Sequence, residues 1–142
     1  MGHTLPMAFV SITRLRIRSW RFLPAFFLYA MRSSKQARES PGNLGMSVLN
    51  DARNTFWTRS AWMDESAMKA FMTSGPHLEA MKKLPNWCDE AAVVHWIQNE
   101  ATLPDWKEAH RRLQREGRRS KVLYPSADHE AFEIRPPKVQ GK

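Results

Sequence analysis

The segment Ala91 to Ile97, with the sequence AAVVHWI, constrains the fold of this chain more than any other segment. It is apolar at almost every position, whereas a strand with one face in water alternates apolar and polar residues. We therefore expect a strand that is covered on both faces. One layer of helices covers only one face, so a second layer is required, and a second copy of the same sheet is the simplest candidate.

The first half of the chain predicts a strand, a helix and a hairpin. Residues 8–17 are rich in β-branched and aromatic side chains, which is typical of a strand. Residues 19–40 repeat apolar side chains at three- and four-residue steps, which predicts a helix. Residues 44–49 and 55–63 are separated by Asn- and Asp-containing turn residues, and we expect them to pair as a hairpin.

A second helix begins after the hairpin. Asp64 is a good N-cap, Gly75-Pro76 is expected to interrupt the helix, and Pro85 to stop it. With the final strand, the order becomes strand, helix, strand, strand, helix, strand. This order predicts a ferredoxin-like α+β fold, with an antiparallel sheet and both helices on one side.

The C-terminal part lies outside this plan. We expect residues 8–100 to form the ferredoxin-like α+β domain and residues 101–142 to add a C-terminal helix and an irregular tail. The added helix is predicted at about 105–117, with Trp106, His110 and Leu113 on one apolar stripe.

The net charge of +8 invites a nucleic-acid hypothesis, but its distribution speaks against one. The excess lies in residues 1–40 and 105–121, whereas the central part, which most resembles a folded core, is slightly acidic. The Arg residues at 107–121 could contact phosphates, or they could form the solvated face of a docked helix. We expect the second arrangement, with nucleic acid as the less favoured partner.

No targeting or membrane segment is expected. The apolar stretch 20–31 is too short to span a bilayer, and no small-residue cleavage site follows it. We therefore expect a cytoplasmic protein without membrane contact. The surplus of six Trp and eight Met favours a large apolar interior, a ligand cavity or a subunit interface.

The stretch from Gly42 to Met81 resembles the dimeric α/β-barrel proteins of the antibiotic-biosynthesis-monooxygenase superfamily. Its most specific part is a strand that ends in Trp62, followed by an acid, by Phe71 and by Ser-Gly-Pro-His ending at His77. The similarity is greatest to uncharacterised bacterial proteins and to the spheroidene-monooxygenase-like branch. It implies a homodimeric α/β barrel with a pocket between the second helix and the sheet.

The activity that the resemblance implies is less specific than the fold. Members include cofactor-free oxygenases and haem-degrading enzymes, so haem and no cofactor at all both stay open. The haem-degrading branch is similar in using an Asn on the first strand and a Trp and a His on the second helix. Here the first strand has no Asn, and Phe71 and Met81 occupy the other two positions. That mechanism cannot be carried over.

His77 is the candidate catalytic residue. It follows the helix interruption, so a neutral imidazole there could serve as a general base or as an axial haem ligand. The alternative is a structural histidine that binds carbonyl groups left free by Pro76. His95, on the apolar strand, is either a buried histidine with a hydrogen-bond partner or a second pocket residue.

Aromatic residues could line a flat apolar pocket, or they could simply form the core. The candidates are Trp57, Phe71 and Trp96. Arg59 shares a strand face with Trp57 and could bind a carboxylate there, or it could be a solvated or interface arginine. Cys88 precedes two acids, which raise the pKa of a thiol and oppose a nucleophilic role. Phosphate-loop, Ser-elbow and metal-ligand spacings are absent from the sequence, and no metal site is expected.

These observations favour a monooxygenase-like protein that binds a small hydrophobic or polycyclic molecule. Two alternatives remain: a ligand-binding dimer of the same fold without chemistry, and a basic protein weakly associated with nucleic acid.

Overall fold

The structure is a computed structural model that describes residues 7–138. The elements in chain order are β1 (Ala8–Ile17), the short 3-10 helix η1 (Trp20–Phe22), α1 (Leu23–Glu39), β2 (Asn43–Asp51), β3 (Thr55–Trp62), α2 (Glu65–Met72), α3 (Gly75–Trp87), β4 (Cys88–Gln98), α4 (Trp106–Glu116), β5 (Arg118–Arg119) and α5 (Ala127–Ala131). The fold is the expected α+β ferredoxin-like one.

The sheet has the strand order β2-β3-β1-β4-β5, and every pairing is antiparallel. β1 is the middle strand of the five and pairs with β3 on one side and with β4 on the other. β5, which the sequence analysis did not predict, adds two residues at the β4 edge.

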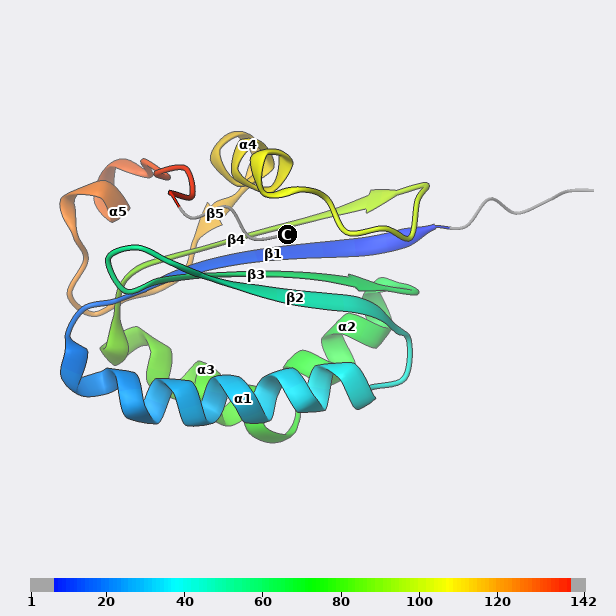
Figure 1. Ribbon diagram of the computed structural model, residues 1–142, viewed down its shortest axis with the longest axis horizontal. Coiled ribbons are helices and arrows are strands. Elements are labelled where there is room, and N and C mark those ends of the chain that lie inside the picture. The colour runs from blue at the N-terminus through cyan, green and yellow to red at the C-terminus, as the bar shows by residue number, and fades with distance from the viewer. Residues whose placement is uncertain (1–6, 139–142) are drawn as a thin grey trace, which may run out of the picture.

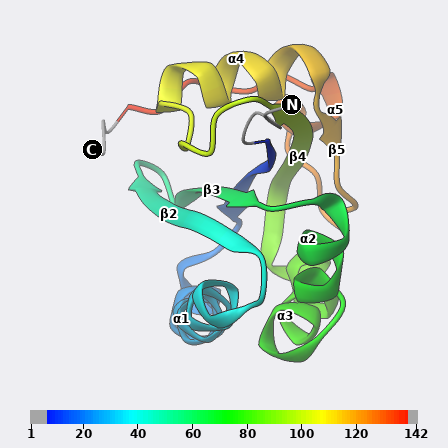
Figure 2. The same ribbon diagram turned by 90° about the vertical axis from the view of Figure 1, so that its right-hand side faces the viewer.

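The molecule has three layers (Figure 1). Helices α1, α2 and α3 lie on one face of the sheet, while α4 and α5 lie on the other. Figure 2, viewed from the side, shows α1 beneath β2 and β3, with α2 and α3 on the β4 side. We call the two surfaces of the sheet the helix-side face (toward α1–α3) and the α4-side face. Side chains of one strand alternate between them.

The α4-side face is covered by the chain itself, which corrects the reasoning that assigned it to a second copy of the sheet. Trp106, Ala109 and Leu113 of α4 are buried in one apolar cluster with sheet residues such as Trp57 and Val94. The strand β4 is therefore covered on both faces, as its composition requires, but the second layer comes from residues that were assigned to a C-terminal extension.

Local signals in the sequence account for most element boundaries. Asp64 caps α2 by accepting a hydrogen bond from the Ala67 amide at 2.8 Å, and Pro24 lies in the first turn of α1. α2 ends before Gly75, which adopts φ +58. The prediction that Pro85 stops the helix is wrong, because Pro85 lies inside α3, which continues to Trp87.

The described helices are all too short or too polar to cross a lipid bilayer.

Candidate functional site

A row of polar side chains crosses the centre of the helix-side face. Ser11 and Thr13 of β1 lie opposite Ser60 and Thr58 of β3, and Ser11 also lies opposite His95 of β4. We call these five residues the polar row. Apolar clusters flank it at both ends of the sheet, one around Trp62 and Phe71 and the other around Ile17, Phe26 and Phe56.

The helices do not seal the polar row. Thr13, Thr58 and His95 remain partly exposed, although β1 is a central strand with helices packed on this face. A central strand below a helical layer is normally inaccessible, so solvent reaches the middle of this face. Ser33, on the buried side of α1, has an Oγ that is buried without a hydrogen-bond partner among the described residues. A ligand here would meet hydroxyl groups as well as apolar walls.

His95 has the chemical properties of a base. Its Nε2 is buried and has no hydrogen-bond partner among the described residues, and its ring lies 5.5 Å from that of Phe9. Burial, together with the positive charge of Arg118, lowers the pKa of His95 below its ordinary value of 6.5. The imidazole is therefore neutral at pH 7 and can accept a proton.

His77 lies at the junction of α2 and α3. Its Nδ1 is 3.2 Å from the Met72 carbonyl oxygen, to which it donates in the corresponding tautomer, and its ring lies 4.5 Å from that of Phe71. The Phe71 ring in turn stacks on Trp62 at 5.2 Å. Burial lowers the pKa of His77, although the hydrogen bond to Met72 opposes this shift. The hydrogen bond to Met72 is the one expected of a structural histidine. It is also compatible with a role as a base, because a neutral ring that donates from Nδ1 has a free lone pair on Nε2.

Three residues assigned to the same pocket lie on the other side of the sheet. Trp57 is fully buried on the α4-side face, 6.4 Å from the ring of Trp106. Arg59 donates to the Pro104 carbonyl at 2.6 Å and lies over Trp106. Trp96 is buried in the same cluster. These three residues belong to the docking surface of α4, and the sheet separates them from Phe71, His77 and His95.

The space between α2 and the sheet does not fit haem. Trp62, Met68 and Phe71 fill that layer and are at most 8% exposed. A flat macrocycle would have to displace all three, so no chemistry is assigned to haem. The more open part of the helix-side face lies at the polar row, toward the middle of the sheet.

Other candidate groups have structural explanations. Burial, reinforced by the charge of Asp89, raises the pKa of the Cys88 thiol to about 12. The carboxylate effect expected from the sequence is thus present but smaller than that of burial. Within the described part of the chain, no three His, Cys, Asp or Glu side chains gather in a way that could hold a metal ion.

Sequence reasoning missed Gln36, which joins α1 to the α2–α3 junction. Its Nε2 donates to the carbonyls of Phe71 and Ser74, and its Oε1 accepts from the amide of His77. It also missed the polar row, although the hydroxyl residues in the alternation of residues 8–17 and 55–63 were a usable signal. No local signal marks Gln36, because its partners lie more than thirty residues away.

Comparison with solved structures agrees with this fold. A protein from Nitrosomonas europaea proposed to be an antibiotic biosynthesis monooxygenase matches with 18% identity and a TM-score of 0.56, over 70% of this chain and 95% of its own. A Pseudomonas aeruginosa protein matches with 13% identity and a TM-score of 0.59, over 68% and 98%. SnoaB, a cofactor-independent oxygenase from Streptomyces nogalater, matches in a mutant form with 13% identity and a TM-score of 0.52, over 67% and 94%.

The chain therefore shares its ferredoxin-like fold with these proteins, among them two described as antibiotic biosynthesis monooxygenases, the superfamily that the stretch from Gly42 to Met81 resembles. No curated protein matches the chain. The sequence pattern of the family described as "Domain of unknown function (DUF3291)" matches residues 29–121, and the chain belongs to that family. The matched region runs from α1 through β5 and so includes α4.

Proposed function

We propose that this protein binds a small hydrophobic molecule with a polar group on the helix-side face, over the polar row, and oxidises it in a monooxygenase-like reaction. The observation that carries the proposal is the partly exposed polar row with the unpartnered Nε2 of His95. The apolar clusters at both ends of the row offer contacts to a flat molecule, and the hydroxyls of Thr13 and Thr58 offer hydrogen bonds.

The chemistry follows from a neutral base in a partly desolvated site. His95 removes a proton from an activated CH₂ group of the ligand, and the resulting carbanion is electron-rich enough to reduce O₂. Overall, the CH₂ group and O₂ become a carbonyl group and one water. All the electrons come from the substrate, so no external reductant is needed. His77, the base expected from the sequence, is the second candidate for this step.

The binding part is tested with 2-naphthol, a small bicyclic phenol, by following backbone amide shifts in NMR. We expect the shifts to centre on residues 11–13, 58–60 and 95. Thr13→Val removes a hydroxyl at nearly constant volume and should weaken binding roughly fivefold, as expected for one hydrogen bond. Thr102→Val, at an exposed position, is the matched control. Shifts confined to the α4-side face would contradict the proposal.

The catalytic part is tested with the molecule that native mass spectrometry finds bound to the protein purified from cells. Oxygen uptake with that molecule should be lost in His95→Ala and retained in His110→Ala, whose ring lies on the α4 side near Trp57. His77→Ala shows whether the second histidine is required. A bound molecule that is never consumed under oxygen would identify a binding protein without chemistry.

A further inference from the structure

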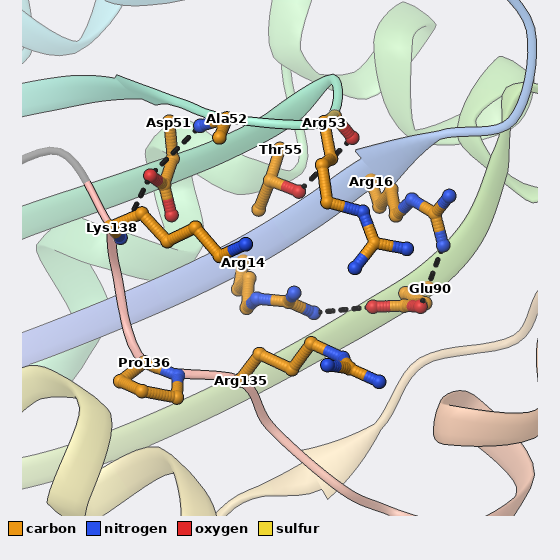
Figure 3. A pocket seen from close by; sticks show the side chains of 10 residues that line it. All are labelled: Arg14, Arg16, Asp51, Ala52, Arg53, Thr55, Glu90, Arg135, Pro136 and Lys138. Atoms are coloured by element: carbon orange, nitrogen blue, oxygen red, sulfur yellow. Dashed lines mark hydrogen bonds and ion pairs between the residues drawn. The ribbon is translucent and has the colours of Figure 1, made fainter.

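A pocket rich in cations opens on the α4-side face, at the end of the sheet that carries the β2–β3 turn (Figure 3). Four segments far apart in the sequence form its wall: the second half of β1, the turn, the start of β4 and the C-terminal segment 135–138. The lining contains five basic side chains, Arg14, Arg16, Arg53, Arg135 and Lys138, but only two acidic ones, Asp51 and Glu90.

The inner wall is built around one buried carboxylate. Arg14, only 4% exposed, donates from Nη1 to Glu90 Oε1 at 2.7 Å, and Arg16 donates from Nη1 to Glu90 Oε2 at 3.2 Å. Ser126 also donates to Oε2, at 2.8 Å. The Nε groups of Arg14 and Arg16 are buried and have no acceptor among the described residues. Arg16 Nη1 also lies 3.8 Å from Asp89 Oδ2. The two guanidinium groups therefore share the Glu90 carboxylate and this longer ion pair, and their Nε donors are left over.

The outer wall adds three cations. Lys138 is held there by its backbone amide, which donates to Asp51 Oδ1 at 3.0 Å, and Figure 3 shows its side chain extending toward Arg14. Arg53 reaches toward the same space from the turn, and the structure gives its guanidinium no hydrogen bond or ion pair with a described residue. Arg135 Nε donates to Asp128 Oδ2 at 2.6 Å, so its two terminal nitrogens are still available to a ligand.

We propose that this pocket is an anion site that takes the phosphoryl group of a small phosphate ester or of free phosphate. The excess of positive charge selects an anion. Donors converge from the turn, from β1 and from the C-terminal segment, and a tetrahedral oxyanion presents oxygens in several directions, whereas a carboxylate presents two.

The size of the pocket indicates that it binds a small chemical group and does not enclose a whole ligand. Its cavity volume is about 20 Å³, enough for one or two water-sized oxygens. The oxygens of the phosphoryl group would face Arg14 and Arg16, while Arg53, Arg135 and Lys138 close around it at the mouth. The inference does not rest on the proposed oxidation, because Arg14 and Glu90 lie on the opposite face of the sheet from Thr13 and His95.

The experiment measures the affinity of the full chain for inorganic phosphate by isothermal titration calorimetry, with amide shifts in NMR to locate the site. Arg53→Gly removes a guanidinium at a position with φ +63, which glycine adopts without strain. Lys138→Ala removes an ammonium and keeps the backbone bond to Asp51. Each variant should weaken phosphate binding roughly tenfold, and the effect should shrink as salt is added. Arg32→Ala, an exposed arginine of α1, is the control of equal charge change and should bind as the wild type does.

Three outcomes would overturn the assignment. The site is refuted if the wild-type protein does not bind phosphate, or if Arg53→Gly and Lys138→Ala bind it as tightly as wild type does. Benzoate binding with equal affinity and the same shifts makes it a general carboxylate site instead. Binding of a single-stranded oligonucleotide without binding of phosphate makes the surface a polymer contact.

Two further measurements complete the experiment. Phenyl phosphate in place of inorganic phosphate distinguishes the ester from the free ion, and circular dichroism shows that each variant is folded.

Discussion

At the residue scale, the ion pair of Arg14 with Glu90 governs the α4-side face at the end of the sheet. Both side chains are 5% exposed, so neither charge is solvated by bulk water. Burial alone would raise the pKa of Glu90, but hydrogen bonds from Arg14 and Ser126 outweigh it and hold the pKa below its ordinary value of 4.5. Forming such a pair costs desolvation energy. Removing one partner is nevertheless strongly destabilising, because the other charge is left buried without a counter-charge.

Glu90→Gln should therefore lower the free energy of unfolding at pH 7 by about 3–5 kcal/mol, because Arg14 loses its counter-charge. Urea denaturation measures the change. Glu79→Gln, which disrupts the exposed pair with Lys82, is the control and should stay within about 0.5 kcal/mol of wild type.

The pH dependence of the Glu90→Gln effect has a defined sign. A carboxyl group whose folded-state pKa is depressed stabilises the fold above its unfolded-state pKa, and this contribution is lost as the pH falls through the folded-state value. The stability gap between wild type and Glu90→Gln should therefore be constant near neutrality and narrow below about pH 4.5. A gap that widens in acid would refute this account.

Single-residue roles were predictable where local chemistry decides them. The capping by Asp64 follows from its neighbours in the sequence, and the raised pKa of Cys88 follows from them in direction, although burial is its larger cause. Trp57 was assigned to the wrong side of the sheet, because the strand periodicity identifies which residues share a face but not which layer covers that face.

At the scale of elements, α4 depends on a close turn at its C-terminal end. Gly117 follows the helix directly, and its amide donates to the Leu113 carbonyl at 3.1 Å. A Cβ at this position would lie 2.5 Å from the Leu113 carbonyl oxygen and 3.1 Å from that of Val93. Both are backbone atoms, so neither can move aside as a side chain would.

Gly117→Ala should therefore destabilise the protein by about 1–3 kcal/mol, as overpacking does. Thermal unfolding followed by circular dichroism should show a lower Tm. Gly45→Ala in β2 is the matched control, since its added Cβ would meet only Leu103 side-chain carbons at 3.8 Å. Equal Tm values for the two variants would show that α4 can shift without cost.

Most elements could be predicted because each carries its own pattern. β1 has the predicted bounds, and α4 lies within the predicted range of residues 105–117. β5 was not predictable, since two arginines carry no strand signal and pair only where β4 offers an edge. The prediction for Pro85 was wrong because α3 continues past this residue. The Pro85 carbonyl accepts a hydrogen bond from the distant Leu123 amide at 2.8 Å, a contact that no local pattern indicates.

At the scale of the whole molecule, α4 decides which surfaces are open to association. A homodimer in which two sheets pack face to face would require α4 to leave the α4-side face, where Trp106 and Leu113 are buried. The homodimer that the sequence led us to expect remains a proposal, and the structure limits it to another surface or to a state with α4 displaced.

Leu113→Asp should release α4, because it places a charge at a position with no exposure. We expect concentration-dependent self-association in size-exclusion chromatography with light scattering, as the apolar residues of β1 and β4 become accessible. Arg115→Asp, on the exposed side of the same helix, should leave the molar mass measured by light scattering the same as that of wild type. A wild-type dimer that dissociates on Leu113→Asp would instead identify α4 as the subunit interface.

The central place of β1 has a consequence for how the chain reaches its fold on the ribosome. β1 is synthesised before both of its neighbours, and its register with β4 joins residues about eighty positions apart. β3 can pair with one edge of β1 early, but the other edge must wait until β4 has emerged, and such long-range pairing slows folding. Arg14 and Arg16 lie at alternate positions in its second half, and Arg18 follows its last residue. Charged residues beside an apolar strand disfavour its pairing with a second copy, so we expect these arginines to protect the open edge of β1 until β4 arrives.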